Sequence, residues 1–380
     1  MDYAKESLRL HNEKKGKLSI KSKFPVRNKT DLSIAYTPGV AEPCRLINKN
    51  EENVYKYTIK GNMVGIVTDG SAVLGLGNIG AKASIPVMEG KAILMKRFAG
   101  VDAFPIALAT QDVEEIIKAV KQISPVFGAI NLEDISAPRC FEIEKRLRKE
   151  LDIPIFHDDQ HGTAMVVLAG LINSLKLCNK KIQDVKIVMN GAGAAGVAIA
   201  KLLIVYGFQD LIMCDTKGAI YQGRTEGMNP IKEELARITN KKIIRGSLKE
   251  AIKGADIFIG VSAPNTMTQD MIKSMNKNPV IFAMANPSPE IMPDEAKKAG
   301  AMIVATGRSD FPNQLNNVLV FPGIMKGLLK TRKQITDTQK IAVAKAIAKI
   351  IKPTKNKIIP SPFDMRVSKA VEKAIINTKE

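Results

Sequence analysis

The glycine-rich run Gly191-Ala192-Gly193-Ala194-Ala195-Gly196 constrains the fold of this chain most strongly. The apolar residues 185–189 before it read as a buried strand, and residues 194–206 after it read as a helix. In such a unit the first glycine makes the turn, the second admits a pyrophosphate and the third lets the helix approach its strand. A second strand ends at Asp215, where an acid would bind ribose hydroxyls. The predicted cofactor-binding residues are Gly191, Gly193, Ala194, Ala195, Gly196 and Asp215.

Short apolar strands alternate with helices along most of the chain, which indicates parallel sheets covered by helices on both faces. Expected strands before the glycine run are 64–67, 104–108 and 128–132, and expected strands after it are 211–215, 257–260, 280–283 and 302–305. The predicted fold is α/β, with three parts. They are an N-terminal α/β substrate- and metal-binding domain over residues 1–160, a Rossmann-type domain with a doubly wound parallel sheet over 161–330, and a helical C-terminal tail over 331–380.

Composition excludes few classes of protein. The 380 residues carry a formal net charge of +19, which makes a basic nucleic-acid-binding protein the alternative from a different class. The lysines are dispersed and no aromatic residues interleave with them, so nucleic acid is not the expected partner. No uninterrupted apolar run approaches the roughly 18 residues of a membrane span. The charged N-terminus lacks an apolar signal core, so a cytoplasmic location without a membrane partner is expected. The cysteines show no paired spacing and are read as free thiols.

Two acidic pairs follow apolar segments. Glu133-Asp134 comes after residues 128–132, and Asp158-Asp159 comes after residues 153–156. Parallel sheets place their ligand sites at the carboxyl ends of strands. Glu133, Asp134 and Asp159 are therefore the candidate metal ligands, and their oxygen atoms favour a hard divalent cation. Beside a nicotinamide cofactor, such a cation predicts metal-assisted oxidation of a hydroxy acid.

Other interpretations of these acidic pairs stay open. Either pair alone is typical of a solvated loop or a helix cap, and Asp134 precedes a segment that it could cap. His157 and His161 have the i, i+4 spacing of zinc ligands, but no third nitrogen or sulfur ligand is evident.

Two further side chains are candidates for acid–base chemistry. Lys91 follows Glu89-Gly90 and precedes the apolar residues 92–94, and burial there would lower its pKa and make it a general base. A lysine whose head reaches solvent is the alternative. Tyr36 lies beside the turn Thr37-Pro38-Gly39, where a purely structural role is equally open.

A set of motifs in fixed order resembles the malic enzyme family. They cover the chain from about residue 33 to 323, and the length resembles the short microbial form of the family. The motifs are Ala35-Tyr36-Thr37-Pro38-Gly39-Val40, Thr68-Asp69-Gly70-Ser71-Ala72-Val73-Leu74-Gly75-Leu76-Gly77, Glu89-Gly90-Lys91, Asn131-Leu132-Glu133-Asp134, Phe156-His157-Asp158-Asp159-Gln160-His161-Gly162-Thr163, the glycine run at Gly191, Asn286-Pro287-Ser288-Pro289-Glu290 and Asn316-Asn317-Val318.

The resemblance implies a role for each matching residue. Lys91 corresponds to the general base, Tyr36 to the general acid, and Asp158 to an acid beside the lysine that holds its ammonium or tunes its pKa. Glu133, Asp134 and Asp159 correspond to Mg²⁺ or Mn²⁺ ligands. Asn286 and Asn317 correspond to residues that contact the substrate carboxylate or the nicotinamide. One position departs from the family, because Ala72 stands where larger members place a carboxylate-binding arginine.

The reaction that the resemblance implies is oxidative decarboxylation of L-malate to pyruvate and CO2 with reduction of NAD. We expect NAD to be preferred, because a carboxylate at Asp215 would repel a 2′-phosphate, and NADP to be tolerated because Lys217 lies nearby. A malolactic-type enzyme and an oxaloacetate decarboxylase are the related alternatives. A homodimer is the family's expected assembly.

Overall fold

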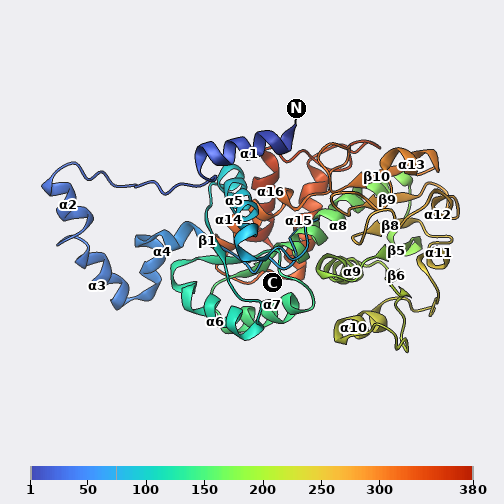
Figure 1. The fold of residues 1–380 in the computed structure, drawn as a ribbon, viewed down its shortest axis with the longest axis horizontal. Helices are drawn as coiled ribbons and strands as arrows, with labels where there is room; N and C mark the ends of the chain where they lie inside the picture. Colours follow the sequence, from blue (N-terminus) through green and yellow to red (C-terminus); the bar gives the residue numbers. More distant parts are fainter. Residues whose placement is uncertain (1, 74, 379–380) are drawn as a thin grey trace.

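Two mainly parallel sheets form the framework of the protein (Figure 1). The structure, a computed structural model, describes residues 2–73 and 75–378; Leu74 of the glycine-rich segment lies outside this part. The first sheet has the order β2-β1-β3-β4, and all of its pairs are parallel. Its strands are β1 (Met63–Thr68), β2 (Asp102–Ala107), β3 (Ala129–Leu132) and β4 (Ile155–His157). Most residues of β1, β3 and β4 are buried, as expected for strands covered on both faces.

The second sheet has the order β10-β9-β8-β5-β6-β7. Its strands are β5 (Lys186–Asn190), β6 (Asp210–Asp215), β7 (Gly218–Ala219), β8 (Ile257–Gly260), β9 (Val280–Ala283) and β10 (Ile303–Thr306). Every pair is parallel except β6 with β7. The chain continues from β5 to β6 on one side and later to β8 on the other. This reversal beside β5 is the place where such sheets bind their ligands. The predicted α/β fold with a Rossmann-type unit is confirmed.

The helix α8 (Asp158–Cys178) begins at the end of β4, in the middle of the molecule (Figure 1). It packs against α9 (Ala194–Tyr206) and α15 (Asp337–Lys349). By length and composition α8 could cross a membrane, but 72% of its most apolar window is buried inside the protein. The central helix of a globular core satisfies the same criterion, so this finding is weak evidence for a membrane span.

The C-terminal helices pack onto the body. Helix α14 (Phe321–Thr331) packs on α5 (Gly80–Ala99), and α16 (Arg366–Asn377) packs on α14. Gly323 and Gly327 allow this second contact, because a Cβ atom at either position would lie 2.7 Å from a side-chain carbon of α16. The remaining helices of the body are α6 (Val113–Ile123), α7 (Arg139–Glu150), α10 (Pro230–Ile238), α11 (Leu248–Ala251), α12 (Gln269–Lys273) and α13 (Pro293–Lys298). Short 3-10 turns are η1 (Glu51–Asn53), η2 (Ile59–Asn62), η3 (Ser124–Val126), η4 (Ile182–Asp184) and η5 (Asn317–Leu319).

Residues 18–59, called the arm below, project away from this body (Figure 1, left). The arm carries α2 (Lys29–Ala35), α3 (Ala41–Lys49) and α4 (Val54–Tyr57), and no residue of these helices is buried. It is preceded by α1 (Tyr3–Lys14). Both of its ends are fixed to the body. Lys17 donates to Glu89 Oε2 and Pro86 O of α5, and the buried Lys60 donates to Ser124 O and Phe127 O.

Candidate active site

A cavity of about 640 Å³ lies between the two sheets, at the carboxyl ends of their strands. Both acidic pairs lie near it because β3 and β4 are neighbours that end at the same edge, and Glu133, Asp134 and Asp159 are part of its lining. Glu133 and Asp134 follow β3 directly, and Asp158 and Asp159 form the first turn of α8. The lining also includes Ala72, Val87, Lys91, Ser136, Gly193, Ala194, Ala195, Gly196, Ser262, Asn286, Asn316 and Asn317.

Three carboxylates form one cluster at the floor of this cavity. One oxygen atom each from Glu133, Asp134 and Asp159 lie within 4.8 Å of one another. The backbone of Asp134 has a φ of 53° and donates its amide to Asp159 Oδ2 at 2.8 Å. Asp134 Oδ2 is buried without a hydrogen-bond partner. A buried, unpartnered carboxylate oxygen beside two more carboxylates fits a hard divalent cation.

Mutual repulsion and burial disfavour ionisation of these acids. Burial and the neighbouring Asp159 raise the pKa of Asp134 to about 9. Burial, partly offset by the Lys91 ammonium, raises the pKa of Glu133 to about 7. Because a cation binds the ionised forms, its binding would release protons from the cluster.

Lys91 extends from α5 into the same cluster. Its Nζ lies 2.6 Å from Glu133 Oε1 and 2.5 Å from Asp158 Oδ2, and 4.4 Å from the centre of the Phe321 ring. Burial alone would lower the pKa of Lys91, but Asp158, Glu133 and Asp159 outweigh it and raise this pKa. The expectation of a burial-lowered pKa was therefore wrong for this arrangement, because the sequence did not reveal how many carboxylates surround the ammonium.

A glycine one turn along α8 makes room for Asp158. The Asp158 side chain is fully buried, and burial raises its pKa to about 7 despite the nearby Lys91. A Cβ atom at Gly162 would lie 1.9 Å from Asp158 Oδ1 and 3.2 Å from the Cβ of Asn317. Glycine at position 162 therefore lets the carboxylate occupy the position from which it holds Lys91.

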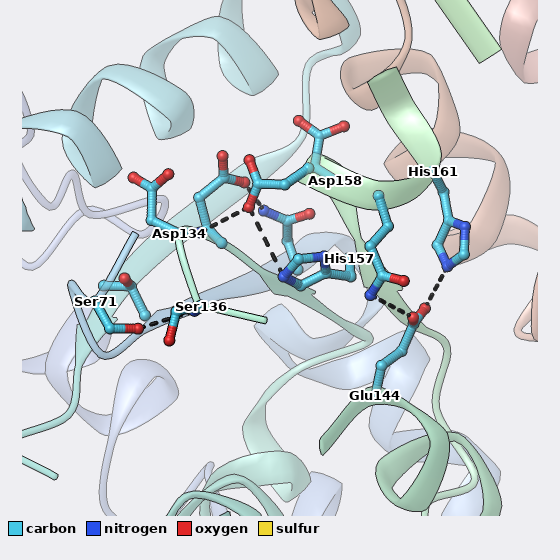
Figure 2. Close-up of polar contacts among 12 residues, drawn as sticks. Ser71, Asp134, Ser136, Glu144, His157, Asp158 and His161 are labelled. Carbon is cyan, nitrogen blue, oxygen red and sulfur yellow. Dashed lines mark hydrogen bonds and ion pairs between the residues drawn. The ribbon is translucent and has the colours of Figure 1, made fainter. Parts of the chain in front are cut away.

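The two histidines of this segment do not form a zinc site. Figure 2 shows His161 turned toward Glu144, whose Oε1 lies 2.7 Å from the ring Nε2. Gln160 donates to the other oxygen of Glu144. His157 is fully buried, which lowers its pKa to about 4, and its Nε2 lies 3.7 Å from Asp159 Oδ2. Within the described residues, the potential metal-binding group consists of carboxylates alone.

The glycine run forms the turn between β5 and α9. Gly191 has a φ of 116°, in the region that favours glycine. A Cβ atom at Gly196 would lie 1.9 Å from Gly191 O, so α9 can approach its strand only with glycine there. At Gly193 a Cβ atom would meet nothing within 4 Å, and this position lines the cavity. The space above Gly193 fits the close approach of a cofactor pyrophosphate.

Comparison with known proteins identifies the family. The model of the malic enzyme N-terminal domain matches residues 15–148, and that of the malic enzyme NAD binding domain matches residues 160–378. The chain belongs to the malic enzyme family. The predicted resemblance, and with it the prediction of an NAD(P)-dependent malic enzyme, is confirmed at this level.

Individual relatives extend over nearly the whole chain. The bifunctional malic/malolactic enzyme of Bacillus subtilis is 59% identical over 99% of this chain and 92% of its own length. The NAD-dependent malic enzyme of Geobacillus stearothermophilus is 54% identical over 95% of this chain and 76% of its own. The crystal structure of the NAD-dependent malic enzyme of Thermotoga maritima superposes with a TM-score of 0.96 at 50% identity, covering 97% of this chain and 98% of that one.

Asp215 is paired with basic side chains in this malic enzyme fold. Its Oδ2 lies 2.5 Å from Arg224 Nη2 and 2.6 Å from Lys232 Nζ, and its Oδ1 accepts from the Lys217 amide. Burial alone would raise the pKa of Asp215, but the hydrogen bonds from Arg224, Lys232 and Lys217 lower it to about 2. The carboxylate is thus ionised but already paired with two cations. The role of Asp215 as a ribose-binding acid stays a prediction, and the sequence did not indicate its pairing with Arg224 and Lys232.

The described groups at Ser71 and Ala72, in the glycine-rich segment after β1, make hydrogen bonds within the protein. The Ala72 amide donates to Asp134 O, and the Ser71 hydroxyl donates to Asp69 Oδ1 and accepts from the Ser136 amide (Figure 2). These groups are therefore engaged in holding the loop together. Asn286 and Asn317 line the cavity, and so does the neighbouring motif residue Asn316, to which the sequence analysis assigned no role.

Two of the predicted catalytic residues are absent from the described lining of the cavity: Asp158, which contacts Lys91 from beneath it, and Tyr36, which lies far from Lys91 on the arm. Tyr36 ends α2, and its side chain is 67% exposed. Arg224 and Lys232 were missed by sequence reasoning. They lie 9 and 17 positions after Asp215, and no local pattern signals such a pairing.

Proposed function

We propose that this protein catalyses the oxidative decarboxylation of L-malate to pyruvate and CO2, with reduction of NAD or NADP and a requirement for Mg²⁺ or Mn²⁺. One observation carries the proposal. A single cavity is lined by a carboxylate cluster, a buried lysine and the glycine turn of a nucleotide-binding unit. We further propose a cytoplasmic homodimer.

We assign the divalent cation to Glu133, Asp134 and Asp159. When bound, it would supply a Lewis acid for the hydroxyl and ketone oxygens of the substrate. Cation charge would also compensate the carboxylates that now raise the pKa of Lys91. Compensation of this kind would bring the lysine closer to the range in which a general base operates.

The acid–base steps are assigned to three side chains of this protein. Lys91 would take the proton of the malate hydroxyl as hydride leaves for the nicotinamide. Asp158, 2.5 Å away, would hold the ammonium that forms. Tyr36 would protonate the enolate carbon after loss of CO2, and each such group contributes roughly 10²–10⁴-fold. Asn286 and Asn317, whose side chains bear amides, would hold the substrate carboxylate or the nicotinamide.

For the cofactor we propose a preference for NAD with NADP tolerated. Support comes from the pairing of Asp215 with Arg224 and Lys232. The Asp215 carboxylate forms ion pairs with two cations that would otherwise attract a 2′-phosphate. Its own negative charge also repels such a phosphate. Because cations remain nearby, exclusion of NADP would be incomplete.

Malolactic conversion is the second candidate, since the Bacillus subtilis relative is named a bifunctional malic/malolactic enzyme. In that reaction the nicotinamide cofactor would stay bound, and malate would be converted into lactate and CO2, which are then released. An oxaloacetate decarboxylase activity is the further alternative.

A steady-state assay tests the function and its alternatives together. The purified protein would receive L-malate with NAD or NADP and with Mg²⁺ or Mn²⁺, and the products would be quantified. Free reduced cofactor and pyruvate in equal amounts would support the proposal. Lactate without free reduced cofactor would favour the malolactic reaction, and activity limited to oxaloacetate would favour the decarboxylase. A salt-dependent DNA mobility shift without any turnover would favour the nucleic-acid alternative.

A further inference from the structure

Loops that follow three strands of the second sheet form one side of the cavity. Strands β5, β8 and β9 are parallel neighbours, so their carboxyl ends meet at the same edge. The glycine turn follows β5, Val261 and Ser262 follow β8, and Met284, Ala285 and Asn286 follow β9; all three segments contribute to the lining. Loops are usually more mobile than the strands before them. A rigid wall at this place therefore requires contacts that join the loops to one another.

Glu290 binds two of these loops with the two oxygens of one carboxylate. Its side chain is 0% exposed. Oε1 accepts from the Ser262 amide at 2.9 Å, and Oε2 accepts from the Ala285 amide at 3.0 Å. Burial raises the pKa of the Glu290 carboxyl, and the hydrogen bonds from Ser262 and Ala285 counteract part of that rise. Hydrogen bonds to a carboxylate are stronger than those between neutral groups, so one side chain fixes the spacing of the loops after β8 and β9.

The surrounding residues admit this carboxylate and extend its hydrogen bonds. Gly260 ends β8, and a Cβ atom there would lie 2.3 Å from Glu290 Cδ. The Ser262 hydroxyl donates to Glu290 Oε1 at 3.3 Å and accepts from Asn190 Nδ2 at 2.8 Å. Asn190 ends β5, directly before the glycine turn. The connected groups thus reach from the glycine turn to the loop after β9.

The end of this network lies beside a predicted cofactor-binding residue. Ala285, whose amide Glu290 holds, directly precedes Asn286 in the chain. The Asn286 amide group donates to Met284 O at 3.4 Å. On its other side, a Cβ atom at Gly307 would lie 2.7 Å from Asn286 Nδ2. The fixed backbone and these close neighbours together restrict the orientation of the Asn286 side chain.

We propose that Glu290 is a positioning residue for the cofactor, which joins the loops after β8 and β9 before the cofactor binds and so presents Asn286 to the nicotinamide. The inference rests on the proposed function, in which Asn286 is one of the cofactor or substrate contacts. Glu290 is absent from the described lining of the cavity, so it acts through the loops that it joins. A wall that is ordered beforehand reduces the loss of conformational entropy on binding. Breaking the connection should weaken cofactor binding while leaving the metal cluster of the first sheet intact.

Binding of NADH to the full-length protein, measured by calorimetry, tests this role without turnover. Glu290→Gln replaces one carboxylate oxygen with an NH2 group, which cannot accept a hydrogen bond from the amide that faces it. We expect the Kd for NADH to rise about tenfold, with the Kd for Mn²⁺ within about twofold of wild type. Glu295→Gln is the matched control, because Glu295 is an exposed glutamate of α13, and both constants should stay unchanged. An unchanged Kd for NADH in Glu290→Gln, or an equal loss of Mn²⁺ affinity, would overturn the proposal.

A double-mutant cycle tests whether Glu290 acts through Asn286. The effect of Glu290→Gln on the Kd for NADH should largely disappear in an Asn286→Ala background, because the group that it positions is already missing. Effects of the two substitutions that add fully would contradict this route.

Hydrogen exchange of the wild-type protein covers the case in which Glu290→Gln fails to fold. Peptides that contain the Ser262 and Ala285 amides should be as protected without NADH as with it, because their acceptor is already in place. Protection that develops only with NADH would overturn the preformed arrangement. Tight NADH binding by a protein that leaves malate unchanged would refute the proposed function instead.

Discussion

Replacing Gly162 with alanine should lower the catalytic rate, because the new methyl group would displace the Asp158 carboxylate that holds Lys91. The new Cβ atom would lie 1.9 Å from Asp158 Oδ1, whereas ordinary contact begins near 3.4 Å. The carboxylate would have to retreat by well over an ångström, because the methyl group belongs to the rigid backbone of α8. Such a shift would break the 2.5 Å contact with Lys91. Displacement of a catalytic group by about 1 Å can cost about 10²-fold in rate.

The stability of this variant should fall as well. Inserting a methyl group into a packed interior typically costs about 1–3 kcal/mol. Asp158 is fully buried, so its carboxylate has no solvent into which it can move. The assay is kcat with malate at saturating cofactor, with thermal unfolding measured in parallel.

Gly90→Ala is the matched control for this substitution. Gly90 lies in α5 beside Lys91, and a Cβ atom there would meet nothing within 4 Å. We expect wild-type activity and a gain in stability of about 0.5–1 kcal/mol, as alanine suits a helix interior better than glycine. Wild-type kcat and Tm in Gly162→Ala would show that Asp158 does not hold the lysine from this position.

Three further predictions concern the charged groups. Lys91→Ala should lower kcat by roughly 10²–10⁴-fold while leaving NAD affinity, measured by calorimetry, within about threefold of wild type; activity within tenfold of wild type would contradict its role as base. Asp215→Ser should raise kcat/KM for NADP relative to NAD by about tenfold, since Arg224 and Lys232 would be freed; an unchanged ratio would exclude them from the 2′-phosphate site. The pKa of the Asp134 carboxyl is 3.8 in an unfolded chain and about 9 in the folded protein without metal. The folded state therefore binds this proton more tightly, and the free energy of unfolding should fall as the pH rises from 3.8 to about 9. The Tm increase caused by Mg²⁺ should consequently be larger at the alkaline end of that range, and a pH-independent increase would contradict this account.

The sequence was sufficient to predict the main outline of the fold. Gly191 and Gly196 occupy positions where backbone geometry admits little else, and the surrounding apolar periodicity indicated parallel sheets. The acidic pairs were recognisable because each follows a strand that ends at a common edge. Local patterns of this kind depend on residues close in sequence, so a single chain displays them.

Ion pairs between side chains that are distant in the chain could not be predicted from the sequence. Asp215 was identifiable as a strand-end acid, but its pairing with Arg224 and Lys232 depends on how the segment after β7 returns. The direction of the Lys91 pKa was likewise set by carboxylates from β3 and α8, more than 40 positions away. Tyr36 could be singled out by its motif, while its exposure on the arm depends on the arrangement of the whole molecule.

The same buried charges connect these features to the proposed chemistry. Glu133, Asp158 and Asp159 act on one ammonium, that of Lys91, and Asp134 adjoins Glu133 and Asp159. If all were ionised, the cluster would carry an excess of negative charge in a region screened from water, which is unfavourable. Raised pKa values at Glu133, Asp134 and Asp158 express that cost. A divalent cation offsets the excess and permits the carboxylates to ionise, so metal binding and the readiness of Lys91 to accept a proton should be linked through the same electrostatic balance.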